Sequence, residues 1–130
     1  MLAKTILIVD DMLTLRQSAR IILERQGYVV TEAGDGQEAL QKIAESPPDL
    51  VLLDLMMPTM SGLDVLEHIE ADEALQGFPI IVLTAVADRR EMRRFIEMGV
   101  TDYLLKPFTP TALLSQVRRA LGEEETSPAW

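Results

Sequence analysis

Five polar residues stand at or next to the ends of short apolar runs, and their types suit phosphate chemistry: Asp10, Asp11, Asp54, Thr84 and Lys106. Three carboxylates brought together would repel one another unless a cation neutralises them. All-oxygen ligands suit Mg²⁺, which completes its coordination with water and phosphate oxygens. Lys106 would add a second positive charge and Thr84 a hydroxyl donor. The set therefore predicts phosphoryl transfer, with a carboxylate oxygen as nucleophile.

Taken singly, each of these residues has a simpler interpretation. A lone Asp at a strand end is usually a turn former or a helix cap, so Asp10 and Asp11 could serve only to begin the next helix. Asp54 is harder to explain in this way, because a charge inside an apolar run is costly unless it is paired. The recurrence of such residues at the ends of several apolar runs favours one common site.

The elements that would position these residues alternate along the chain. Strands are predicted at Thr5–Val9, Tyr28–Ala33, Leu50–Leu53, Ile80–Leu83 and Asp102–Leu105. Helices are predicted at about Met12–Gln26, Gly36–Ala44, Gly62–Ala71, Arg89–Met98 and Pro110–Leu121. Three of the strands are apolar at every position, which is typical of a parallel sheet covered on both faces. The alternation predicts an α/β fold with a doubly wound parallel sheet, whose ligands bind at the carboxyl ends of the strands.

Local signals agree with these helices. Asp35 and Glu38 form a predicted capping box, and Ser61 with Asp64 is a similar start. Gly27, Gly99 and Gly122 fall where the left-handed residue after a helix is expected.

Composition limits the class of protein. The chain has 130 residues and a net charge of −9, from 12 Lys and Arg against 21 Asp and Glu. Its length suits one domain, its acidity argues against nonspecific nucleic-acid binding, and the lack of Cys excludes a disulfide scaffold. No apolar run approaches the ~20 residues that span a bilayer, so a cytoplasmic protein is expected.

The residues and their spacing resemble the receiver domains of response regulators over residues 4–121. The motifs that carry the resemblance are Ile-Leu-Ile-Val-Asp10-Asp11, Leu-Leu-Asp54-Leu-Met-Met-Pro58-x-Met-x-Gly62, Val-Leu-Thr84-Ala85 and Asp-Tyr103-Leu-Leu-Lys106-Pro107-Phe108. The resemblance implies a single flavodoxin-like (βα)5 domain over residues 1–122, with strand order 2-1-3-4-5. Residues 123–130 would then be a flexible tail or the start of a linker.

The resemblance also implies a role for each site residue. Asp54 would be the phosphoacceptor, taking its phosphoryl group from a sensor histidine kinase or a histidine phosphotransfer protein. Asp11 and Asp54 would bind Mg²⁺ directly together with the backbone carbonyl of Met56, and Asp10 would act mostly through water.

Around the phosphoryl group, Lys106 would pair with its oxygens and Thr84 would hydrogen-bond to it. Tyr103 would turn inward as Thr84 moves. Lys106–Pro107 would be a cis peptide bond, and Gly62 would relieve crowding at the start of the third helix.

The implied activity is that of a switch rather than an enzyme with an external substrate. Output would pass through the fourth helix, the fifth strand and the fifth helix. There the arginines at positions 89, 90, 93 and 94 could meet an acidic partner, could form a symmetric dimer, or could simply be a solvated face. No direct nucleic-acid or membrane contact is expected of this chain.

The resemblance also implies that the side chains at positions 56 and 86 flank the path of the water that hydrolyses the phosphoryl group, and here both are apolar, Met56 and Val86. Neither side chain can orient water by a hydrogen bond, so a long-lived phosphoryl-aspartate is one hypothesis, and simple loop filling is the other.

Two rival functions remain to be compared. A Mg²⁺-dependent phosphatase with an aspartyl-phosphate intermediate usually has a second Asp two residues after its nucleophile, where this chain has Met56. A degenerate receiver that only docks would lack acids or the lysine, which are all present here. Whether the chain is a stand-alone receiver or a piece of a longer regulator is left open.

Overall fold

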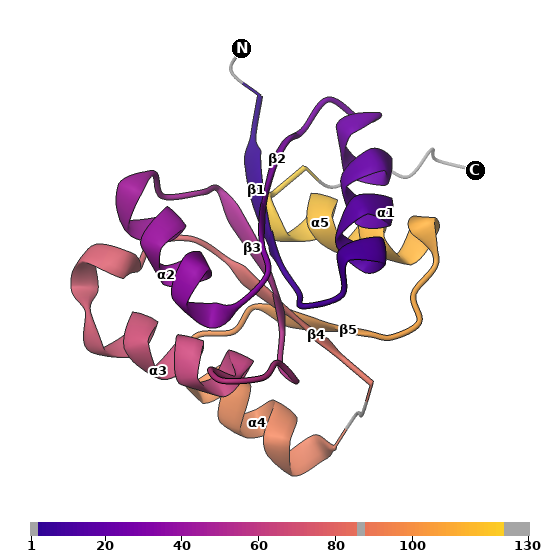
Figure 1. The fold of residues 1–130 in the computed structure, drawn as a ribbon. Coiled ribbons are helices and arrows are strands. Elements are labelled where there is room, and N and C mark those ends of the chain that lie inside the picture. The colour runs from indigo at the N-terminus through magenta and orange to yellow at the C-terminus, as the bar shows by residue number, and fades with distance from the viewer. Residues whose placement is uncertain (1–2, 86–87, 124–130) are drawn as a thin grey trace.

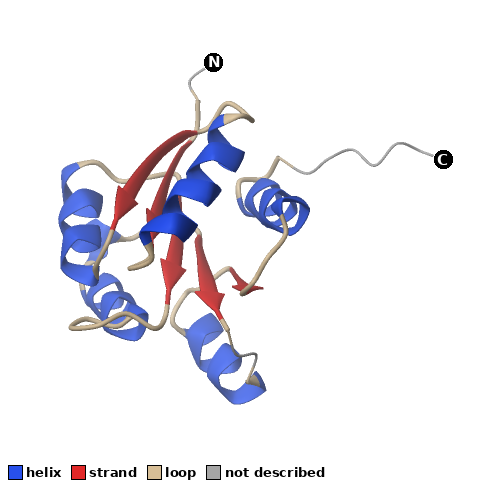
Figure 2. Ribbon diagram, turned by 45° about the vertical axis from the view of Figure 1, so that its right-hand side comes forward, coloured by secondary structure: helices blue, strands red, loops and turns tan. Residues whose placement is uncertain are grey.

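The computed structural model describes residues 3–85 and 88–123, and these form a parallel five-stranded sheet between two layers of helices (Figures 1 and 2). The strands are β1 (Thr5–Val9), β2 (Val29–Ala33), β3 (Leu50–Asp54), β4 (Ile80–Thr84) and β5 (Asp102–Leu105). Their order in the sheet is β2-β1-β3-β4-β5, and every neighbouring pair is parallel. The predicted fold class and strand order are therefore confirmed.

A helix follows each strand: α1 (Leu13–Glu24), α2 (Gly36–Glu45), α3 (Gly62–Ala71), α4 (Arg89–Glu97) and α5 (Pro110–Ala120). Helices α1 and α5 lie on one face of the sheet, and α2, α3 and α4 lie on the other (Figure 1). The sequence did not predict the short 3₁₀ helix Glu73–Leu75, which begins where the Asp72 carboxylate accepts a hydrogen bond from Ala74 N.

Alternate residues of the fully apolar strands feed two separate cores. Leu53 and Val82 face the core under α2, α3 and α4, whereas Leu52 and Leu83 face the core under α1 and α5. Both faces of β1, β3 and β4 are thus covered by helices, which is why these strands are continuously apolar rather than alternating. A rigid sheet of this kind holds the residues at its carboxyl edge in fixed relative positions.

The capping predictions are confirmed with one correction. Ser61 and Asp64 form a reciprocal capping box at α3. Asp35 accepts from Glu38 N as predicted, but the Glu38 carboxylate turns to Gly34 N instead of the N-cap backbone. Gly27, Gly99 and Gly122 have positive φ, as expected for residues that end helices.

Gly62 is required by a close approach between α3 and the end of β3. A Cβ built on Gly62 would lie 2.4 Å from the Asp54 carbonyl oxygen and 2.7 Å from Leu55 Cα. The predicted crowding at this position is therefore confirmed. It comes from the backbone of Asp54 and Leu55 at the end of β3. Among the described residues, no helix is long and apolar enough to cross a membrane.

Candidate functional site

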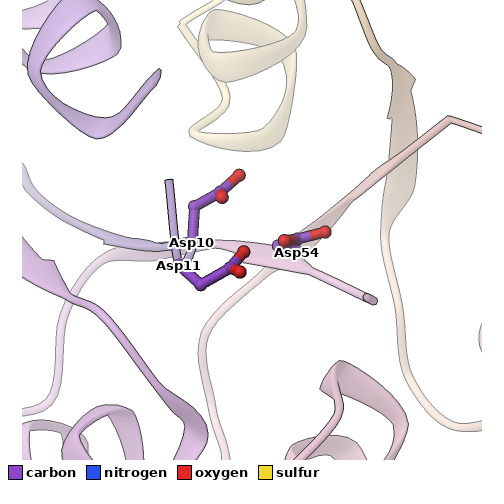
Figure 3. Close-up of side chains that lie close together, drawn as sticks. All are labelled: Asp10, Asp11 and Asp54. Atoms are coloured by element: carbon purple, nitrogen blue, oxygen red, sulfur yellow. The ribbon is translucent and has the colours of Figure 1, made fainter. Parts of the chain in front are cut away.

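Three carboxylates meet at the carboxyl edge of the sheet, as the sequence predicts. Asp10 and Asp11 follow β1, and Asp54 is the last residue of the neighbouring strand β3 (Figure 3). One carboxylate oxygen from each residue lies within 4.8 Å of the other two. Asp10 is fully buried and Asp54 is 3 % exposed, whereas Asp11 is exposed. The cluster is therefore open to solvent on the side of Asp11.

Lys106 reaches this cluster from the end of β5. Its Nζ lies 2.6 Å from Asp10 Oδ2 and 3.3 Å from Asp54 Oδ1, so one ammonium group pairs with two buried carboxylates. The Lys106 backbone N–H donates to the Thr84 carbonyl at the end of β4. Thr84 is itself buried. The sheet thus brings all five predicted polar residues to one edge.

Backbone amides support both buried carboxylates. Met12 N donates to Asp10 Oδ1 at 2.9 Å, and Met56 N donates to Asp54 Oδ1 at 3.1 Å. Asp10 therefore does serve the turn that leads into α1, as the simpler interpretation held. It does so while its second oxygen pairs with Lys106, so the two roles coexist.

The environment of Asp54 disfavours its charge. Burial is the main cause, and the neighbouring Asp10 carboxylate adds to it; together they raise the pKa of Asp54 from 3.8 to about 6. The Met56 N–H and the Lys106 ammonium act in the opposite direction. Asp54 is thus a carboxylate that is still mainly ionised at neutral pH and that gains from any added positive charge.

The donor set fits a small divalent cation. Oxygens bound to one Mg²⁺ lie up to about 4.2 Å apart, since each Mg–O distance is about 2.1 Å. The separation of up to 4.8 Å between the three carboxylates is close to this limit, so small side-chain movements would bring them into coordination. Their excess of negative charge, only partly offset by Lys106, is what such an ion neutralises.

The structure also describes three other features that the sequence singled out: Tyr103, Met56 and the Lys106–Pro107 peptide bond. Tyr103 is half-buried on β5 and packs against the core under α2, α3 and α4. Met56, two residues after Asp54, is 79 % exposed. The Lys106–Pro107 peptide bond is cis, as expected. Val86 lies outside the described residues.

The sequence did not single out Arg16, although the structure places it at the site. Its guanidinium donates to the Asp10 carbonyl oxygen and pairs with Glu32 on β2. An arginine one helical turn after the acidic pair is the only signal that could have indicated it.

Comparisons with known proteins agree with this geometry. Residues 6–118 match the family described as "Response regulator receiver domain". The DNA-binding response regulator MtrA of Mycolicibacterium smegmatis is 43% identical over 95% of this chain and 53% of its own length. The phosphate regulon transcriptional regulatory protein PhoB of Pseudomonas aeruginosa is 39% identical over 93% of this chain and 53% of its own. The chain thus spans about half the length of these relatives.

Solved structures show the same fold. The chemotaxis protein CheY4 of Vibrio cholerae superposes with a TM-score of 0.87 and 32% identity, covering 92% of this chain and 100% of that one. A putative response regulator from Chloroflexus aurantiacus gives a TM-score of 0.85 at 34% identity, covering 93% and 99%. With its sheet order, its acidic edge and a family match over residues 6–118, the chain belongs to the receiver domains of two-component response regulators.

Proposed function

We propose that this receiver domain is a phosphorylation-dependent switch whose phosphoacceptor is Asp54. The observation that carries the proposal is the position of Asp54. It is a buried carboxylate at the carboxyl edge of the sheet, with Lys106 on one side and two further carboxylates beside it. An Asp54 oxygen attacks the phosphorus of a phosphohistidine. The O–P bond forms as the N–P bond breaks, and the electron pair returns to the imidazole of the donor.

Mg²⁺ is the proposed cofactor, held by Asp11 and Asp54 directly, by the Met56 carbonyl and by Asp10 through water. When bound, it would neutralise negative charge on the phosphoryl oxygens. Support comes from the convergence of three carboxylate oxygens and from Met56, whose backbone N–H already bonds Asp54.

Lys106 and Thr84 are proposed to respond to the phosphoryl group. In the unphosphorylated protein Lys106 pairs with Asp10 and Asp54. A phosphoryl group on Asp54 would offer this ammonium stronger acceptors, and the hydroxyl of Thr84 would donate to one of its oxygens. Because Lys106 N also bonds the Thr84 carbonyl, the ends of β4 and β5 would respond together.

The proposed output surface is α4-β5-α5, with Tyr103 as the aromatic group that turns inward. The arginines of α4 at positions 89, 90, 93 and 94 are all exposed on an otherwise acidic protein. The alternatives are an acidic partner, a symmetric homodimer and a solvated face without an occupant. Sedimentation velocity of the phosphorylated protein tests the homodimer, because only self-association increases the mass of the purified chain.

The limits of the receiver domain and its partners are also part of the proposal. Residues 1–122 would form the receiver domain and 123–130 a tail or linker, of which residues 124–130 lie outside the described residues. The donor would be a sensor histidine kinase or a histidine phosphotransfer protein, and no external substrate would be turned over. MtrA is by name a DNA-binding response regulator and PhoB a transcriptional regulatory protein, so a DNA-binding domain in a longer chain is one proposed context.

The experiment is intact mass after incubation with acetyl phosphate and Mg²⁺, beside an Asp54→Asn control. We expect one added phosphoryl group in the wild type, dependent on Mg²⁺ and absent from the variant. Normal labelling of Asp54→Asn would place the site elsewhere. If the wild type gains no mass even from phosphohistidine donors, the switch chemistry is wrong and a docking role replaces it.

A further inference from the structure

The three carboxylates of the cluster differ in what holds them in place. Asp10 and Asp54 each accept a backbone N–H and pair with Lys106. The Asp11 carboxylate has no hydrogen bond or ion pair with any residue in the described ranges 3–85 and 88–123. The direction of Asp11 therefore depends on the backbone that carries it.

That backbone is held by Arg16. The Arg16 guanidinium donates from Nη1 to the Asp10 carbonyl oxygen at 2.6 Å, a short charge-assisted hydrogen bond. This carbonyl belongs to the planar peptide unit that joins Asp10 to Asp11. Fixing the carbonyl thus fixes the plane from which Asp11 extends.

Arg16 is itself held in a fitted position. Its Nε bonds Glu32 Oε1 at 3.1 Å, and its side chain is 15 % exposed. A Cβ on Gly34 would lie only 3.3 Å from Arg16 Nη1, so the missing side chain leaves room for the guanidinium. Two elements, β2 and α1, therefore fix the orientation of Arg16 over the Asp10–Asp11 turn.

We propose that Arg16 is a positioning residue for the Mg²⁺ site, holding the Asp10–Asp11 peptide so that Asp11 presents its carboxylate to the ion. The inference rests on the proposed function, because it assumes that this cluster binds Mg²⁺. It goes further by placing the support of Asp11 in a side chain that touches neither the ion nor the phosphoryl group.

The chain provides a matched control in Arg20. Arg20 pairs with the same Glu32 carboxylate at 2.8 Å and also with Glu24, but it makes no contact with the Asp10 carbonyl and is 41 % exposed. Arg16→Ala and Arg20→Ala both remove a cation from Glu32. Only the first removes the bond to the acidic turn.

The test is calorimetric titration of the 130-residue chain and of each variant with Mg²⁺, without any phosphodonor. We expect Arg16→Ala to weaken Mg²⁺ binding by about 10-fold or more, because mutation of residues that orient metal ligands has effects of this size. Arg20→Ala should leave the affinity within about two-fold of the wild type. With acetyl phosphate, Arg16→Ala should need more Mg²⁺ for half-maximal labelling of Asp54 while reaching the wild-type rate at saturation.

Arg16→Lys keeps the proposal testable if the alanine variant does not fold. Its single nitrogen cannot serve both Glu32 and the Asp10 carbonyl in the geometry of a guanidinium, so an intermediate loss of affinity is expected. Unchanged affinity in both Arg16 variants, or an equal loss in Arg20→Ala, would overturn the role of Arg16 alone. A wild type that binds no Mg²⁺ would overturn the metal site and this role together.

Discussion

At the scale of single residues, the charge of Asp54 is the central quantity. Burial raises its pKa to about 6, above the ordinary 3.8 of the unfolded chain. Ionisation of Asp54 therefore lowers the stability of the folded, metal-free protein. A bound cation would neutralise this buried charge. A carboxylate that opposes folding is explained by function rather than by stability.

This shift predicts a pH-dependent gain from Asp54→Asn. Between about pH 4 and pH 6 the folded state holds a proton that the unfolded state has lost, so the free energy of unfolding of the wild type falls as pH rises. The amide of the Asp54→Asn variant does not ionise, so the variant does not lose this stability as pH rises. We expect the variant to be close to wild type below pH 4 and more stable by at most about 3 kcal/mol above pH 6.

Urea unfolding at both pH values, in EDTA, measures this difference. A variant that differs from wild type by the same amount at acidic and neutral pH would show that Asp54 does not titrate as described.

The apolar side chain of Met56 leads us to predict a long lifetime for the proposed phosphoryl group on Asp54. Met56 is exposed two residues after Asp54, and its thioether cannot orient a water molecule by a strong hydrogen bond. We expect phosphate release from the wild type to take minutes or longer, and Met56→Asn, whose amide can hold water, to shorten it several-fold. Timed release from the purified phosphoprotein checks this. Loss from the wild type within seconds would leave Met56 as a loop residue only.

At the scale of elements, the junction of β3 and α3 carries Asp54, the proposed phosphoacceptor. Helix α3 begins with a reciprocal capping box at Ser61, and Gly62 follows at once, with its Cα against the Asp54 carbonyl. Gly62 N also donates to the Leu55 carbonyl. The start of the helix therefore fixes the backbone of the strand end at which the chemistry would occur.

Gly62→Ala is predicted to damage this junction. The new Cβ would meet backbone at 2.4 Å, which cannot give way without moving β3 or α3. We expect a loss of about 2 kcal/mol or more in the free energy of unfolding, measured in urea, together with slower labelling of Asp54.

Gly36→Ala is the comparison for this change, because its Cβ would meet side chains, those of Met60 and Val65 at 2.8 Å, and no backbone atom as close. Met60 can turn aside and the buried Val65 would have to shift, so we expect a smaller loss than at Gly62. Equal losses in the two variants would show that contact with backbone is not what makes Gly62 necessary.

At the scale of the whole molecule, the sheet order decides which ends become neighbours. β1 lies between β2 and β3, so Asp10 and Asp11 come beside Asp54, although they are more than forty residues apart in the sequence. The crossover to β5 then brings Lys106 to the same edge. Three carboxylates there face the single ammonium of Lys106, so the stability of the folded protein should respond to a cation bound at this edge.

Mg²⁺ is accordingly predicted to stabilise the folded protein, because a ligand that binds only the folded state raises its free energy of unfolding. We expect saturating Mg²⁺ to raise the thermal midpoint, and Asp11→Asn to remove most of that gain. Glu67→Gln, which also removes one exposed negative charge, should keep it. Differential scanning fluorimetry at constant ionic strength measures the effect, and an equal rise in all three proteins would indicate general screening instead of a site.

The sequence by itself determined the elements and the candidate chemistry. Helix and strand patterns are local, because apolar periodicity, capping residues and glycines act on neighbours a few positions away. Even so, the Glu38 carboxylate accepts from Gly34 N rather than from the N-cap backbone, a choice between neighbouring donors that the capping pattern does not decide. The strand order and the roles of the site residues came from the resemblance to receiver domains, and the first of these is now confirmed.

Only the tertiary structure decided how the site residues are held. The pairing of Lys106 with two carboxylates, the raised pKa of Asp54 and the bond from Arg16 to the Asp10 carbonyl all join segments far apart in the chain. Such contacts depend on the packing of α1 against β2 and on the sheet order, and no local pattern encodes them. Types of residue can be read from the sequence, whereas distances and burial arise only when the chain folds.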